Sequence, residues 1–300
     1  MDDMINLIGE YVAHWPIKKK PPMQDTFRAL VGVSCILEGG LAAGKTTAGQ
    51  LMQDAMKDPD VDLPVLFCPE DIDEGMTDYF YEELDAVCQG TKAHNEAAYP
   101  MQIQVVERRK ANYRDLALVT GQSDKPYGGP LRFGIGDRLA GDGVFAVTNY
   151  LNGGISKRQL DVYMPIIGQY PMAIDCIFFL DVTAQEAFLR KNRRAKQPGG
   201  RKIERTVPMD YLHKLRLGYY MLLQAIARRG EVSIQLLAND RMFTGRELLF
   251  KVLDRPTPIR TKELWAHSSV LNSQTSMAEL DSAFEKMHQA YFGIPLKASV

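Results

Sequence analysis

The sequence lacks long hydrophobic runs and an excess of charge of either sign. No apolar run reaches the roughly 18–20 residues that cross a bilayer, and the N-terminal stretch has acidic residues instead of a signal-peptide hydrophobic region. We therefore expect a cytoplasmic protein with no membrane partner. Lys and Arg number 36 against 37 Asp and Glu, a net charge of −1, so composition favours no general attraction to nucleic acid. Any anion site must be local.

Cysteine is also scarce. The four cysteines lie far apart, without a CxxC spacing, and three of them fall in short apolar runs. This pattern favours buried free thiols over a metal or redox site. The chain has 300 residues, 45% of them hydrophobic and 24% charged, which is typical of a folded globular protein with a sizeable core.

Short apolar runs alternate with helix-compatible stretches along the middle of the chain. The runs cover residues 31–37, 63–68, 131–135, 173–180 and 233–237, and a helix is expected at 45–56. Their hydrophobicity is continuous, which indicates strands that are covered on both faces. The sequence therefore predicts an α/β fold, a five-stranded parallel sheet with helices on both faces.

The domain organisation follows from where this pattern begins and ends. We expect one α/β domain over residues 29–240. Residues 1–28 contain three consecutive lysines followed by two prolines and are expected to form an arm. Residues 241–300 form a C-terminal extension, for which a helix near 277–291 is predicted.

A glycine-rich segment joins the first strand to the first helix and fits G-x-x-x-x-G-K-[ST] in full. In such a loop backbone N–H groups surround phosphate oxygens, Lys45 reaches the β- and γ-phosphates, and the Thr46 hydroxyl binds Mg²⁺. The sequence therefore predicts binding of a nucleoside triphosphate, ATP, with Mg²⁺. The expected nucleotide-binding residues are Gly39, Gly40, Leu41, Ala42, Ala43, Gly44, Lys45, Thr46 and Thr47.

Charged residues follow two of the other runs. Glu70 comes after the second run, so we expect it at the carboxyl edge of a strand that neighbours the loop strand, where it can accept a proton from a hydroxyl. Asp137 and Arg138 follow the third run; the carboxylate suits a metal ion or its waters, and the guanidinium suits a phosphoryl group. Residues 190–205 include eight Lys or Arg and a Pro-Gly-Gly break, which indicates a basic lid over a triphosphate or, alternatively, a nucleic-acid patch.

Together these motifs resemble the deoxynucleoside kinase family, including the herpesvirus-type thymidine kinases, over residues 31–230. EGGLAAGKTT at 38–47 is similar to the family's first motif, Glu70 falls at its catalytic glutamate, and Asp137–Arg138 matches its acidic-Arg pair. LDVTAQE at 180–186, with Arg190 and Arg194, resembles the lid entry. ERTVPMDYL at 204–212 resembles the stretch in which a glutamate binds the sugar 3′-hydroxyl. The resemblance implies a P-loop kinase with a basic lid.

The resemblance also implies roles for single residues. Gln102 would read the base through its amide, with Met101 beside it and Arg109 two turns further along the helix. Tyr81 and Glu204 would contact the sugar. Two positions that are aromatic in the family hold Gly75 and Val147, and Met76, Tyr79, Phe80 or Phe145 are candidates to replace those rings. The implied sets are catalytic Glu70, Arg138 and Lys45; substrate-binding Glu70, Tyr81, Met101, Gln102, Arg109, Arg138 and Glu204; ATP-binding Arg190 and Arg194; and metal-binding Thr46 and Asp137.

The leading hypothesis is an ATP- and Mg²⁺-dependent kinase acting on the 5′-hydroxyl of a deoxynucleoside, thymidine or another pyrimidine. The sequence does not decide whether the protein forms a homodimer. One alternative is a thymidylate kinase, whose motifs the chain also resembles. A monophosphate acceptor needs another cation beside Glu70, and the residues just before Glu70 supply none. A second alternative is a protein that binds ATP to control assembly or nucleic-acid contact.

Overall fold

A computed structural model gives the fold of the chain. It describes residues 30–253 except for 60, 71–73, 124–127, 139–140, 168–173, 198–203, 205, 230–231 and 239–242. The expected arm at 1–28, the helix near 277–291 and the glycine break of the lid lie outside the described residues.

The five predicted runs form one parallel sheet, as expected. Its strands are β1 (Ser34–Glu38), β2 (Val65–Cys68), β3 (Phe133–Asp137), β4 (Cys176–Asp181) and β5 (Ser233–Ala238), in the order β2-β3-β1-β4-β5. The expectation that the Glu70 strand neighbours the loop strand is wrong, because β3 lies between β1 and β2. Chain order does not specify which later strand inserts between two earlier ones.

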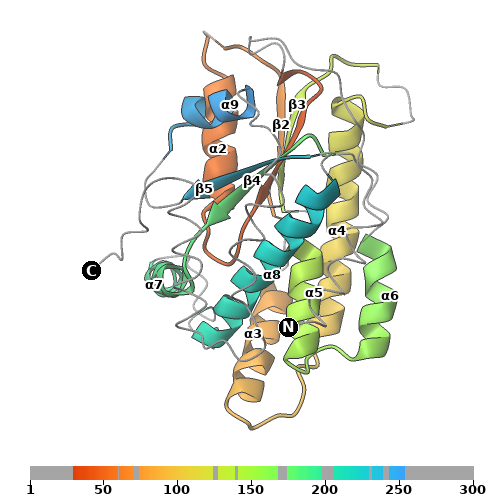
Figure 1. Ribbon diagram of the computed structural model, residues 1–300, viewed down its shortest axis with the longest axis vertical. Coiled ribbons are helices and arrows are strands. Elements are labelled where there is room, and N and C mark those ends of the chain that lie inside the picture. The colour runs from red at the N-terminus through yellow and green to blue at the C-terminus, as the bar shows by residue number, and fades with distance from the viewer. Residues whose placement is uncertain are drawn as a thin grey trace.

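Helices cover both faces of the sheet, as Figure 1 shows, with α2 and α9 on one side and α4 on the other. The predicted helix at 45–56 is confirmed as α2. The helices are α2 (Lys45–Met56), α3 (Glu74–Cys88), α4 (Ala98–Val119), α5 (Gly141–Leu151), α6 (Lys157–Ile167), α7 (Ala184–Arg194), α8 (Met209–Arg229) and α9 (Gly245–Leu253). The chain reaches α3 and α5 directly beyond the carboxyl ends of β2 and β3, so these helices border that edge of the sheet.

Helix α9 packs against α2, although it lies beyond the expected end of the domain at residue 240. The two helices approach closely at Gly245, where an added Cβ would lie 1.9 Å from the Leu51 carbonyl oxygen. Arg246 pairs with Asp58 at 2.7 Å, just after α2. Helix α2, which starts at the glycine-rich loop, therefore packs against the segment that follows β5.

The register of the strands determines which residues meet at the carboxyl edge. In β3, Gly136 is the partner of Cys68, and Asp137 is the partner of Leu37. Glu70, two residues beyond Cys68, therefore emerges level with Arg138, two residues beyond Gly136. The end of β3 thus lies between the Glu70 segment and the glycine-rich loop.

Candidate active site

The glycine-rich loop leads from β1 into α2 and has backbone conformations that suit it to enclose an anion. Gly39 and Gly44 have φ of 150° and 87°, and a Cβ on Gly39 would lie 2.7 Å from the Leu180 carbonyl oxygen. Gly44 is the N-cap of α2, and no side chain caps it. The positive end of the α2 dipole is therefore directed at the space that the loop encloses.

Lys45 folds back over this loop. Its Nζ donates a hydrogen bond to the Gly40 carbonyl at 3.2 Å, and the residue is 6% exposed. Burial, followed by the positive charge of Arg138, lowers the pKa of Lys45 below its ordinary value. An anion bound in the loop would favour the charged ammonium again.

Thr46 and Asp137, the two expected metal ligands, are in contact. The Thr46 hydroxyl donates to Asp137 Oδ2 at 2.7 Å, while the other carboxylate oxygen, Oδ1, is buried without a hydrogen-bond partner among the described residues. A hydroxyl and a carboxylate are the kind of ligand that Mg²⁺ takes from a protein when phosphates and waters supply the rest. The two residues therefore fit the expected ion. No cluster of three or more His, Cys, Asp or Glu occurs among the described residues.

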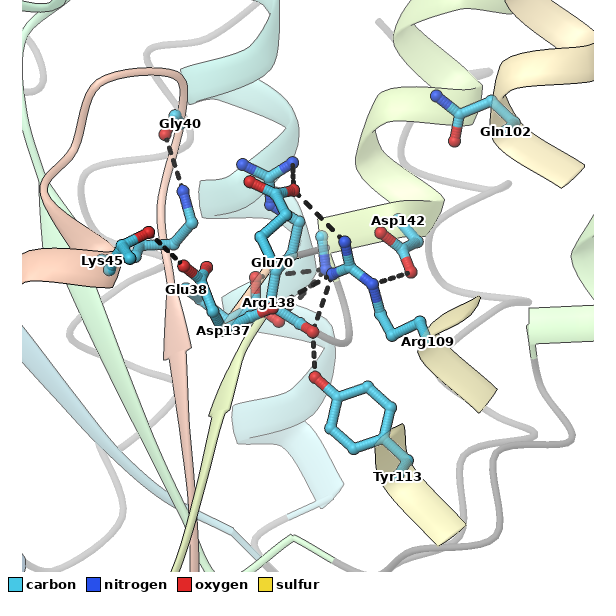
Figure 2. Close-up of polar contacts among 12 residues, drawn as sticks. Glu38, Gly40, Lys45, Glu70, Gln102, Arg109, Tyr113, Asp137, Arg138 and Asp142 are labelled. Carbon is cyan, nitrogen blue, oxygen red and sulfur yellow. Dashed lines mark hydrogen bonds and ion pairs between the residues drawn. The ribbon is translucent and has the colours of Figure 1, made fainter. Parts of the chain in front are cut away.

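Glu70 lies between two arginines, as Figure 2 shows. Its carboxylate pairs with Arg138 at 2.9 Å and with Arg109 at 3.2 Å. The Glu70 side chain is 15% exposed, whereas the two arginines are almost fully buried. Buried charges of this kind are stable only when they are paired, so the three residues form one unit at the end of β2 and β3.

The surroundings of Arg138 keep it charged. Its guanidinium lies 4.2 Å from the centre of the Phe145 ring, on α5. Burial alone would lower the pKa of Arg138, but the negative charges that face it, Glu70 first, outweigh burial and raise it. Arg138 is therefore a permanently positive group beside a carboxylate, on the same edge of the sheet as Lys45.

Arg109 was expected near the base, and the structure places it in the Glu70 unit. It comes from α4 and donates from Nη1 to the Arg138 carbonyl at 2.7 Å. Its Nε pairs at 3.2 Å with Asp142, in the first turn of α5. Arg109 therefore connects three elements around Glu70. It also supplies a cation beside Glu70, which the local sequence before Glu70 does not.

Gln102 lies on the same helix but apart from this unit (Figure 2). It is 2% exposed, and its Oε1 accepts a hydrogen bond from the Tyr163 hydroxyl at 3.1 Å. Met101 is buried beside it. The Gln102 amide is thus held by α6, and the structure does not bring it together with Arg109.

The residues expected at the sugar come from two segments that touch. Tyr81 is buried in α3 with its ring against Phe80, and its carbonyl accepts from the Thr206 hydroxyl at 3.4 Å. Glu204 is fully buried and paired with Arg194 of α7. The segment that carries Glu204 therefore lies against α3, while the partner of this carboxylate is an arginine that was expected at the triphosphate.

The other expected lid cation, Arg190, pairs with Glu186 one helical turn earlier at 2.6 Å. Both side chains are about one quarter exposed, at 26% and 25%. The structure thus places Arg190 on the partly exposed face of α7.

Some residues around the site were not among the expected site residues. Asp142 follows Gly141, which belongs to none of the quoted motifs. Tyr113, one turn after Arg109, donates a hydrogen bond from its hydroxyl to the Arg138 carbonyl. Glu38, fully buried at the end of β1, accepts from the Gly141 backbone N–H at 3.2 Å and caps α5. For Tyr113, the sequence offered one signal: it lies four residues after Arg109, and residues four apart are neighbours on one face of a helix.

No family model matches the sequence, and no curated protein matches it either. Solved structures do match. They include deoxyadenosine kinase from M. mycoides with the products dCMP and a flexible dCDP bound, at 16% identity and a TM-score of 0.51, over 74% of this chain and 97% of that one. The same enzyme with bound dATP is 18% identical, and with bound dCTP 17% identical; each has a TM-score of 0.51 and covers 74% of this chain and 99% of the other.

These structures, all below 20% identity, establish a likeness of fold. Within the part of the chain that the structure describes, no helix combines the length and hydrophobicity that a membrane span requires. The chain thus has the fold of these deoxyadenosine kinase structures, with its glycine-rich loop, Glu70 and Arg138 at one edge of a five-stranded parallel sheet.

Proposed function

We propose that the protein is a cytoplasmic kinase that transfers the γ-phosphoryl group of ATP to the 5′-hydroxyl of a deoxynucleoside, with thymidine or another pyrimidine deoxynucleoside as acceptor. The observation that carries this proposal is the 2.9 Å contact between Glu70 and Arg138 at the sheet edge where Lys45 lies over the loop. A carboxylate, a permanent cation and a phosphate loop at one edge are what phosphoryl transfer to an alcohol requires.

In this proposal Glu70 accepts the proton of the 5′-hydroxyl, and Arg138 holds the attacking oxygen and the phosphoryl group. Lys45, with Arg190 and Arg194 from α7, balances the negative charge that spreads over the phosphoryl oxygens. Thr46 and Asp137 would hold Mg²⁺, which when bound neutralises charge on the phosphates. The carboxylate of Glu70, which would accept the proton, contacts both arginines.

The acceptor would lie along α4, between the Glu70 unit and Gln102. Gln102 would bind the base through its amide, with Met101 beside it and Phe145 as a ring close to the site. Tyr81 and Glu204 would bind the sugar, which requires Arg194 to exchange its contact with Glu204 for the triphosphate. The deoxyadenosine kinase structures hold both dATP and dCTP, so the assay of this protein compares purine and pyrimidine acceptors.

A nucleoside monophosphate kinase is the second candidate, because Arg109 lies 3.2 Å from Glu70 and could face an acceptor phosphate. Its charge is already matched by Glu70 and by Asp142, at 3.2 Å each. An additional phosphate would have to displace one of these carboxylates. We therefore place the nucleoside first.

One assay separates the candidates. ATP consumption and product identity are measured with each of the four deoxynucleosides and with thymidine monophosphate, using wild type and Lys45→Ala as the control. The proposal expects a 5′-monophosphate product from a pyrimidine deoxynucleoside, and none from the control. Turnover restricted to thymidine monophosphate supports the second candidate. Salt-dependent polynucleotide binding without acceptor-stimulated ATP consumption supports an assembly protein instead.

A further inference from the structure

The backbone of Arg138 has an unusual conformation. Its φ is 66°, in the left-handed region that glycine tolerates and a long side chain rarely adopts. Such a conformation persists only where surrounding contacts outweigh its cost, and it is often found where a side chain must be positioned for function. The guanidinium of this residue pairs with Glu70.

The backbone N–H and the carbonyl of Arg138 are held by different elements. Its N–H donates to the Leu37 carbonyl of β1 at 2.9 Å, which continues the β1–β3 ladder. Its carbonyl accepts from Arg109 Nη1 at 2.7 Å and from the Tyr113 hydroxyl, both on α4. A carbonyl oxygen has two lone pairs, so these two donors use both and fix the direction of the peptide.

Tyr113 reaches this carbonyl because β3 leaves room for it. An added Cβ on Gly136 would lie 2.9 Å from Cε1 of the Tyr113 ring. Tyr113 is 1% exposed, and burial raises its pKa well above the ordinary value, so the hydroxyl keeps its proton and remains a donor. Figure 2 shows the hydroxyl directed at the Arg138 backbone from below the Glu70 unit.

We propose that Tyr113 is a positioning residue for phosphoryl transfer: with Arg109, it holds the Arg138 peptide in the left-handed conformation that directs the guanidinium at Glu70. The inference rests on the proposed function for the reaction that it serves. Arg109 contacts Glu70 itself, so its substitution would disturb the carboxylate directly. The Tyr113 contact that matters here is with the backbone of Arg138, which makes Tyr113 the informative position.

The test is Tyr113→Phe, which keeps the ring beside Gly136 and removes the hydroxyl. We expect kcat to fall about 10- to 100-fold, the effect of a misplacement near 1 Å, while KM for ATP and for the nucleoside changes less than about twofold. The matched control is Tyr220→Phe, which removes the hydrogen bond from another buried tyrosine to Asp181, while Arg216 keeps its contact with that carboxylate. We expect the control to retain wild-type kcat.

A double-mutant cycle shows whether the hydroxyl acts through Arg138. In an Arg138→Ala background, Tyr113→Phe should cause no further loss of kcat, because the group that it positions is gone. An equal loss in both backgrounds would overturn the inference, as would wild-type kcat in Tyr113→Phe.

A crystal structure of Tyr113→Phe gives a readout that needs no turnover. We expect residue 138 to leave the left-handed region or its carbonyl to move away from Arg109. An unchanged residue 138 would overturn the inference even if activity fell. If wild type phosphorylates no nucleoside, the proposed function fails, and this structure still decides whether Tyr113 holds the Arg138 peptide.

Discussion

Replacing Glu70 with glutamine is the most direct perturbation of the proposed chemistry. Glutamine has nearly the same shape and can still accept a hydrogen bond from Arg138, but its amide cannot take a proton. A positioned base contributes about 10²–10⁴-fold to a rate, so kcat should fall by that factor, equivalent to about 2.7–5.5 kcal/mol of barrier. The affinity for ATP should be unchanged, because Lys45 and the loop belong to β1 and α2.

Glu70→Asp should have an activity between those of the wild type and Glu70→Gln. It keeps the charge but withdraws the carboxylate by one methylene, about 1.5 Å, which breaks the 2.9 Å contact with Arg138 and the 3.2 Å contact with Arg109. We expect a loss of about 10²-fold from misplacement. Activity should therefore decrease in the order Glu, Asp, Gln.

The assay combines steady-state nucleoside phosphorylation with ATP binding measured by calorimetry. Glu107→Gln is the matched control, since Glu107 is 65% exposed on α4 and pairs with Lys110. It should behave as wild type. Near-wild-type turnover of Glu70→Gln would refute the role of this carboxylate, and a parallel loss of ATP affinity would show that Glu70 supports the loop instead.

Three further outcomes concern stability. Gly245→Ala should lower the unfolding free energy by about 1–3 kcal/mol, because its Cβ would lie 1.9 Å from the Leu51 carbonyl oxygen, whereas Gly128→Ala, with no atom of the described residues within 4 Å, should be neutral in urea titrations. Arg216→Ala should cost about 3–5 kcal/mol by leaving the fully buried Asp181 without its 3.0 Å partner, and a melting curve close to wild type would contradict this. Burial lowers the pKa of Lys191 from 10.5 to about 8, so between these values the unfolded chain binds a proton that the folded chain does not, and stability should rise with pH. Lys191→Met should reduce that rise in unfolding titrations from pH 7 to 11, and the part that remains includes the contribution of Lys45, whose pKa is also lowered.

The glycine-rich loop between a strand and a helix could be predicted from the sequence because all of its residues lie in one continuous segment. Residues 39–46 carry the glycines, the lysine and the hydroxyl in one segment, and the apolar run before them predicts the strand that the structure contains. The positions of Glu70 and Arg138 at the edge of the sheet could also be predicted, since both residues follow apolar runs and the carboxyl ends of parallel strands meet at one edge.

The contacts within the site could not be predicted in the same way. Arg109 and Asp142 are 33 positions apart, and their pairing depends on how α4 and α5 pack beyond β3, which no local pattern specifies. Likewise, no local pattern in the sequence specifies that β3 lies between β1 and β2. The base role predicted for Arg109 came from the family resemblance, and helix spacing from Gln102 supported it; that spacing places both residues on one face but does not specify their partners.

The position of β1 in the middle of the sheet, between β3 and β4, bears on how the protein is synthesised. Gly39 packs against the Leu180 carbonyl, and Glu70 needs Arg138, so the earliest motif in the chain depends on segments made roughly 70–140 residues later. A nascent chain that has emerged only as far as β2 holds the whole glycine-rich motif but lacks β3, β4 and α9, which pack against β1 and α2. The proposed nucleotide affinity should therefore arise late in translation, after β4 joins the sheet.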